Sequence, residues 1–185
     1  QYGVIVGLLA ILIFFTVMKA KFMTLDNIVN MLRQTSINGL LAVGMTFVVL
    51  TGGIDLSVGS VVALSGVVTV KLIVEAGMSI PVAFAMGLLS GVVSGAASGL
   101  IIAYTEMPPF IVTLAMQNIC RGAAYLIAGG NPIRITQGAF ESIGTGYIGW
   151  APLPVIYTAV ILICAFFIIN KSRLGRHIYA IGGNK

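Results

Sequence analysis

Chemistry in this chain is most plausible where an apolar run meets Gly52 and Gly53 and then Asp55 and Ser57. Glycines can adopt positive φ and end a helix, and an aspartate or serine can cap the first amides of the next one. A carboxylate at membrane depth is usually functional, so Asp55 can equally belong to a solute or gating site. Both interpretations fit the residues. The pattern predicts a helix broken near 51–57.

A second polar group lies inside an apolar run and comprises Gln117, Asn118 and Arg121. Their spacing of three and four residues places them on roughly one helical face. An arginine exposed to lipid is costly, so this face should meet protein or water. It is either an internally paired or snorkelling arginine, or a polar patch along a solute path.

No set of residues with credible spacing for catalysis is present. His177 is the single histidine, and Cys120 and Cys164 are far apart in sequence, which predicts neither a metal site nor a disulfide framework. The pattern at 144–149 matches the dinucleotide glycine motif, but it follows no strand and is taken as a chance match. We therefore expect no catalytic residue, no metal and no cofactor in this chain.

Composition sets the class of protein. Hydrophobic residues make up 58% of the 185 residues and charged residues only 8%, whereas soluble domains carry about 25% charged residues. The chain is therefore predicted to lie in a lipid bilayer, with room for about six helical spans. Its net charge of +5 comes from scattered basic residues rather than a basic face, so nucleic acid is not an expected partner.

The hydropathy pattern predicts an all-α fold, a polytopic membrane helical bundle within residues 1–170. Its six spans are expected at about 3–18, 37–50, 55–74, 82–104, 110–128 and 155–169. An amphipathic lead-in at 25–33 could lie along the membrane interface. The polar stretch 129–154 is a predicted loop with a short helix at about 137–143.

The end of the chain sets the expected topology. Lys171, Arg173, Arg176 and Lys185 form a basic cluster without acids, which favours the cytoplasmic side. Alternation then places 51–54 near the inner side and the long loop outside. If the second and third segments are instead two halves of one broken crossing, the N-terminus moves outside.

Glycines recur every four residues in the fourth apolar segment, at Gly87, Gly91, Gly95 and Gly99. Residues four apart share a helical face, and small residues there let another helix backbone approach closely. This row predicts tight helix packing, with a solute-lining role as the alternative.

The last residues predict a short amphipathic helix from about Leu174 to Ile181, stopped by Gly182 and Gly183. It is either an ordinary basic cytoplasmic segment or a helix that docks on a soluble partner.

Three blocks in order resemble a known family. They are Gly44–Ser60, the run Pro109–Leu114 followed by Arg121 and Gly122, and Ser172–Asn184. Together they resemble the permease subunits of ABC sugar importers of the ribose/xylose/galactoside type. Family members continue with further spans, so we expect this chain to represent the N-terminal part, with residues 171–185 as a truncated cytoplasmic coupling loop.

The resemblance implies a mechanism and partners. Two permease subunits, alike or different, would form the pathway, a separate ATPase would bind ATP on the cytoplasmic side, and an extracytoplasmic binding protein would deliver a monosaccharide. The chain would be a multi-pass protein of a bacterial inner membrane. The residues that would contact the ATPase are Ser172, Arg173, Leu174, Gly175 and Arg176.

Other functions remain open at this point. The solute could be a nucleoside or a signalling sugar rather than a nutrient sugar. A structural or assembly subunit is a further class. An intramembrane enzyme built on Asp55 and Arg121 lacks a nucleophile and base at suitable spacing.

Overall fold

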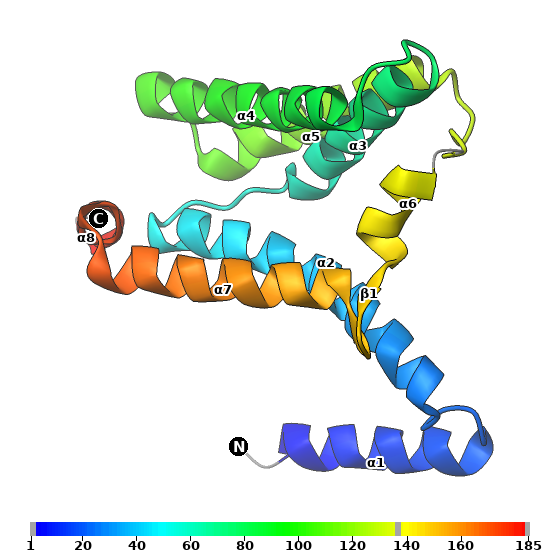
Figure 1. Ribbon diagram of the computed structural model, residues 1–185. Helices are drawn as coiled ribbons and strands as arrows, with labels where there is room; N and C mark the ends of the chain where they lie inside the picture. The colour runs from blue at the N-terminus through cyan, green and yellow to red at the C-terminus, as the bar shows by residue number, and fades with distance from the viewer. Residues whose placement is uncertain (1–2, 136–137, 184–185) are drawn as a thin grey trace.

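A computed structural model describes residues 3–135 and 138–183. These residues form eight helices and one short antiparallel hairpin, which confirms the all-α class (Figure 1). The helices are α1 (Gly3–Met18), α2 (Leu25–Leu50), α3 (Val58–Val74), α4 (Ile80–Thr105), α5 (Pro109–Ala128), α6 (Gly138–Thr145), α7 (Leu153–Lys171) and α8 (Arg173–Gly183). The hairpin pairs β1 (Tyr147–Ile148) with β2 (Ala151–Pro152), and Tyr147 lies opposite Pro152.

Several boundaries differ from those expected. The lead-in and the second apolar segment form one unbroken helix, α2, because no glycine or proline interrupts the chain from 25 to 38. The third helix begins at Val58 rather than at Asp55, which lies in the break. The short helix in the long loop is α6, but Gln137, its expected start, lies outside the described residues.

Length and composition distinguish the apolar helices. Within the described residues, α4, α5 and α7 are each long and apolar enough to cross a bilayer, whereas α1 and α3 are apolar but shorter. No residue of α1 is buried. The six expected apolar segments are all helical, and the number that cross the membrane stays a prediction.

Three helices pack into one unit, which we call the α3–α5 group (residues 58–128). α3 lies against both α4 and α5. The hydroxyls of Ser65 on α3 and Ser90 on α4 are 3.3 Å apart. The thiol of the buried Cys120 on α5 lies 3.6 Å from the hydroxyl of Ser94 on α4. Small polar side chains thus hold these helices close together.

A second unit, the α2–α7–α8 group, comprises residues 25–50 and 153–183. The hydroxyl of Thr158 on α7 lies 3.0 Å from the carbonyl oxygen of Ser36 on α2. A Cβ added to Gly39 would lie 3.1 Å from the methyl group of Thr158, so this glycine lets α7 approach α2. α8 follows α7 and contacts both α7 and α2.

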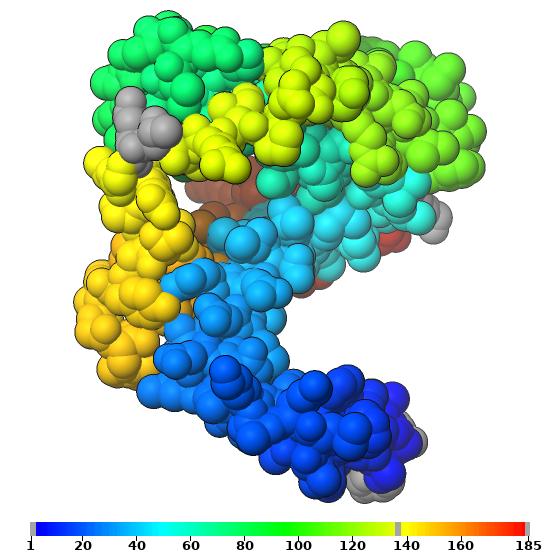
Figure 2. Space-filling view, turned by 90° about the vertical axis from the view of Figure 1, so that its right-hand side faces the viewer, coloured from blue at the N-terminus to red at the C-terminus, as the bar shows by residue number. Residues whose placement is uncertain are grey.

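The chain links the two groups at opposite ends. In Figure 1, α2 runs toward the end that carries α8, and α3 runs back from it, so the break is a turn between two helices rather than a kink inside one. At the other end, Figure 2 shows α6, in yellow, at the left edge, below the α3–α5 group and to one side of α2. Arg33 on α2 fastens this loop, since its guanidinium donates to the hydroxyl of Tyr147 and lies 5.0 Å from that ring.

Candidate functional site

The helix break begins with a defined end to α2. Gly52 has φ 77°, in the left-handed region. Its amide donates to the carbonyl of Val49 at 2.9 Å, and the amide of Gly53 donates to that of Val48 at 3.1 Å. This pair of bonds is the Schellman arrangement that satisfies the last carbonyls of a helix. Of the two glycines expected at positive φ, Gly52 alone has it, and Gly53 does not.

Asp55 closes a local turn just before α3. One carboxylate oxygen, Oδ1, accepts from the backbone amide of Ser57 at 2.8 Å and from its hydroxyl at 2.6 Å. Ser57 is the residue that precedes the first turn of α3, and its side chain makes no capping hydrogen bond to that turn. The expected capping of the first helical amides is therefore wrong in detail. Asp55 instead orders the residue from which the helix starts.

Thr113 on α5 holds the break from the other side. Its hydroxyl oxygen accepts the amide of Leu56 at 3.2 Å. The same hydroxyl lies 3.1 Å from the carbonyl oxygen of Ile54 and 2.9 Å from that of Pro109. Thr113 is 3% exposed, so these bonds are shielded from water. One side chain thus satisfies backbone groups that the break leaves without helical partners.

Sequence reasoning did not single out Thr113. Its signal was present in the second block of the resemblance, one helical turn after the proline that begins α5. A threonine at that position in an apolar helix normally bonds its own helix. Only the packing of α5 against the break shows that the hydroxyl also bonds backbone groups of the break.

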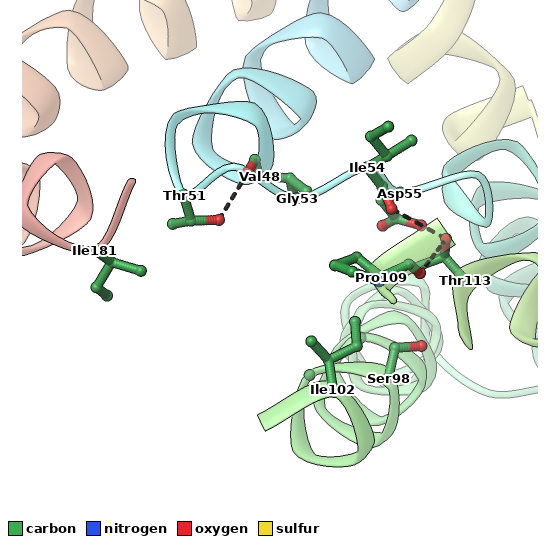
Figure 3. Close-up of a pocket in the computed structure, with 12 residues that line it drawn as sticks. Val48, Thr51, Gly53, Ile54, Asp55, Ser98, Ile102, Pro109, Thr113 and Ile181 are labelled. Carbon is green, nitrogen blue, oxygen red and sulfur yellow. Dashed lines mark hydrogen bonds between the residues drawn. The ribbon is translucent and has the colours of Figure 1, made fainter. Parts of the chain in front are cut away.

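A pocket of about 400 Å³ lies between the break and α4 (Figure 3). Its lining comes from the α3–α5 group, from the break and from α2 and α8 of the other group. Most of this lining is apolar. The lining residues are Val48, Thr51, Gly53, Ile54, Asp55, Gly95, Ser98, Gly99, Ile102, Pro109, Thr113 and Ile181. Ser98 is 6% exposed, and its hydroxyl has no hydrogen-bond partner among the described residues. This volume suits a small solute.

The four glycines of α4 divide into two pairs. A Cβ at Gly87 would lie 1.9 Å from the hydroxyl oxygen of Thr69 and one at Gly91 would lie 3.1 Å from the hydroxyl oxygen of Ser65, so both face α3 closely. Gly95 and Gly99 have no described atom within 4 Å of an added Cβ, and both line the pocket. Among the described residues, this second pair therefore fits the alternative of a solute-lining role, and its part in helix packing stays a prediction.

The polar group on α5 also divides. Gln117 and Arg121 line a small pocket of about 150 Å³ with Gly59 and Ser60 of α3. Asn118 does not line it and donates to a carbonyl of its own helix, that of Leu114, at 3.0 Å. The expected single face of three residues is therefore wrong for Asn118, whose position lies further around the helix.

α8 is the expected short amphipathic helix, but it extends through both Gly182 and Gly183, which were expected to stop it. At its start, the hydroxyl of Ser172 accepts the amide of Gly175 at 3.1 Å, which is a helix cap. A Cβ at Gly175 would lie 2.0 Å from the carbonyl oxygen of Ile169, so this buried position admits only glycine.

The outer face of α8 is exposed among the described residues. Arg173, Leu174 and Arg176 are exposed, whereas Gly175 between them is buried against α7. The five residues expected to contact an ATPase thus split into two that fix the helix, Ser172 and Gly175, and three that face outward.

Residues 27–185 match the family model described as "Branched-chain amino acid transport system / permease component". The chain belongs to this permease family. The match covers the break, the pocket and α8 together, so these features lie within the family's common region. This family and the sugar permeases similar to the chain confirm the resemblance of the three sequence blocks.

The permease chain is similar to three bacterial relatives. The ribose import permease protein RbsC of Bacillus subtilis is 40% identical over 187 residues, which cover 100% of this chain and 58% of the relative. The protein of the same name from Haemophilus influenzae is 38% identical, covering 97% and 57%. The D-allose transport system permease protein AlsC of Escherichia coli is 36% identical, covering 94% and 53%.

These relatives are named as transport permeases and not as enzymes. The chain spans a little over half the length of the curated relatives it matches. No solved structure matches the chain.

Proposed function

We propose that this chain forms part of the membrane permease of an ATP-binding-cassette importer that moves a monosaccharide into a bacterial cell. The observation that carries the proposal is α8, a short basic helix fixed by its glycines against the membrane helices while its arginines face outward. Such a helix is suited to receive force from a soluble partner. The break lies at the same end of the molecule as α8 (Figure 1), and Ile181 of α8 lines the pocket beside it.

The solute class comes from the relatives. The family description names branched-chain amino acids, whereas similar relatives are named for ribose and allose. A sugar is therefore the favoured solute, and a nucleoside or a signalling sugar is the alternative. The pocket supports a small solute that carries hydroxyl groups, because it offers a carboxylate and hydroxyls beside apolar walls.

The partners follow from the same assignment. A separate ATPase subunit would bind ATP and contact Arg173, Leu174 and Arg176, an extracytoplasmic binding protein would deliver the sugar, and a second permease subunit would complete the pathway. The location would be the inner membrane, with α8 on the cytoplasmic side, as its basic residues favour. An assembly subunit would need none of the ATP turnover that this arrangement transmits.

The test is co-purification of the complete permease with its ATPase. Arg173→Ala combined with Arg176→Ala should abolish recovery of the ATPase while the permease stays folded. Lys19→Ala combined with Lys21→Ala is the matched control, because it removes two exposed basic residues from the turn after α1, away from α8 (Figure 1). Equal ATPase recovery with both pairs would contradict the proposal. ATP-driven uptake of ribose but not leucine into proteoliposomes would fix the solute class.

A further inference from the structure

The C-terminal turn of α8 touches the helix break through backbone atoms. A Cβ at Gly182 would lie 2.0 Å from the carbonyl oxygen of Leu50, 3.1 Å from its carbonyl carbon and 3.5 Å from the Cα of Thr51. No side chain separates the two segments at this point. A displacement of α8 therefore meets the end of α2 directly, without a flexible side chain to absorb it.

The other end of α8 is held in the same way. Gly175 brings the first turn of α8 against the carbonyl oxygens of Ile168 and Ile169 at the end of α7. The two contact points are seven residues apart, about 10 Å along a helix. A short helix fixed at both ends by backbone contacts moves as one body with the ends of α7 and α2.

The pocket lies between this body and the α3–α5 group. Val48, Thr51 and Ile181 supply one side, from the end of α2 and from α8. The facing side comes from the α3–α5 group, including Ser98 and Thr113. The non-helical residues 51–57 join the two sides, and a non-helical segment can change its φ and ψ when the sides move.

We propose that Gly182 couples α8 to the helix break, so that displacement of α8 opens or closes the pocket beside Asp55. Gly182 is a positioning residue in this scheme, since it acts through the end of α2. The inference rests on the proposed function in one respect, namely that an ATPase is what displaces α8.

The chain supplies a matched pair of variants. Gly182→Ala places a methyl group on the carbonyl of Leu50, whereas Gly183→Ala meets no described atom within 4 Å. Both changes replace glycine by alanine in the last turn of the same helix, so their effects on helix propensity are alike. A difference between the two variants therefore reports the contact of residue 182 with the carbonyl of Leu50 and not a change in helix propensity.

A cysteine at Ile54 reports on the pocket, because this residue lines it and is 53% exposed. The background carries Cys164→Ala, and Cys120 stays because it is 1% exposed. The rate of maleimide labelling is measured for the complete permease with its ATPase, in ADP and in ATP with vanadate. The parent and Gly183→Ala should show a severalfold nucleotide-dependent change in rate. Gly182→Ala should lose this change while it still binds the ATPase.

An unchanged nucleotide response in Gly182→Ala would overturn the inference and leave the proposed function standing. A parent that binds no ATPase and shows no nucleotide response would overturn both. These two failures are therefore distinguishable in one experiment.

A second experiment applies if Gly182→Ala does not fold. Leu50→Cys with Gly183→Cys, in the Cys164→Ala background, allows α8 to be bridged to the end of α2 by a flexible bis-maleimide. Because the two segments move as one body, the bridged sample should keep the sugar uptake of its own unbridged sample. Loss of uptake on bridging would overturn the inference.

Discussion

The α3–α5 group and the α2–α7–α8 group both depend on glycines, but they use them differently. In the α3–α5 group, Gly87 lets two helices pack side by side, because an added Cβ there would overlap Thr69. In the α2–α7–α8 group, Gly39 likewise lets α7 approach α2, but Gly175 and Gly182 also place the turns of α8 against the ends of α7 and α2. Side-by-side contacts fix a helix along its length, whereas contacts at helix ends let it transmit a displacement.

The difference predicts where the molecule is rigid. Each group has its own internal contacts, and the described segments that join them are the break and the loop that carries α6. The pocket lies on the boundary and not inside either group. A change of shape would therefore occur between the groups, and variants can separate contacts within a group from contacts across the boundary.

The largest expected effect on stability comes from a variant that disrupts a contact within the α3–α5 group. Gly87→Leu would place its Cβ 1.9 Å from the hydroxyl oxygen of Thr69 and 2.8 Å from the backbone oxygen of Ser65. Since a backbone atom cannot move aside cheaply, we expect a loss of about 3 kcal/mol in stability, the upper range for overpacking. Thermal unfolding of the purified complete permease in detergent measures it.

The control for this variant is Gly95→Leu, because Gly95 belongs to the same row of glycines, spaced four residues apart, on the same helix. Its Cβ meets no described atom within 4 Å, so the unfolding temperature should stay near that of the parent. Equal destabilisation by the two variants would contradict the division of α4 into a packing half and a pocket half.

The next largest effect is expected for a variant that weakens the attachment of the break to the α3–α5 group. Thr113→Val removes the acceptor for the amide of Leu56, and leaving a buried amide unpaired costs about 1–3 kcal/mol. Hydrogen exchange at Leu56 should become faster, whereas Thr113→Ser, which keeps the hydroxyl, should protect this amide as the parent does. Unchanged exchange in the valine variant would mean that Thr113 does not hold the break.

A smaller effect tests the start of α3. Asp55→Ala removes both hydrogen bonds to Ser57 and should cost about 1 kcal/mol, the usual net contribution of a hydrogen bond. Asp55→Asn keeps an oxygen acceptor and should be less damaging to thermal stability. Sugar uptake then separates the two interpretations of this residue. Reduced uptake by the asparagine variant at parental stability would assign the charge to the solute path, and parental uptake would assign the carboxylate to the turn alone.

The smallest effect concerns the second link between the groups. Arg33→Lys loses the planar guanidinium that reaches both the hydroxyl of Tyr147 and the carbonyl of Thr145. The loop should open more often, and chymotrypsin should cleave at Tyr147 or Trp150 severalfold faster. Arg134→Lys, an exposed change in the same loop, is the control. Identical cleavage rates for the two variants would show that Arg33 does not fasten the loop.

Local patterns accounted for much of the fold. The apolar segment expected at about 110–128 formed α5, and the positive φ at Gly52 matched the expected end of α2. The amphipathic tail formed α8. Each of these depends on residues within one or two helical turns, so the information is present in a short stretch of sequence.

The same reasoning failed where two distant segments meet. The spacing of the α4 glycines could not show that Gly95 and Gly99 face a pocket, because spacing gives a face but not the neighbour on it. Gly182 was expected to stop a helix, since glycine often does so. Its actual use depends on the carbonyl of Leu50, more than a hundred residues away in the chain.

The sequence by itself determined the membrane class, the helical segments, the break and the permease family, because hydropathy, caps and ordered sequence blocks are properties of the chain alone. The tertiary structure decided that Thr113 holds the break, that Ser98 faces a pocket, and that α8 rests on the end of α2. These contacts join residues that are far apart in the sequence, and their distance in space cannot be predicted from that separation. Only the packing of whole helices brings them within contact distance.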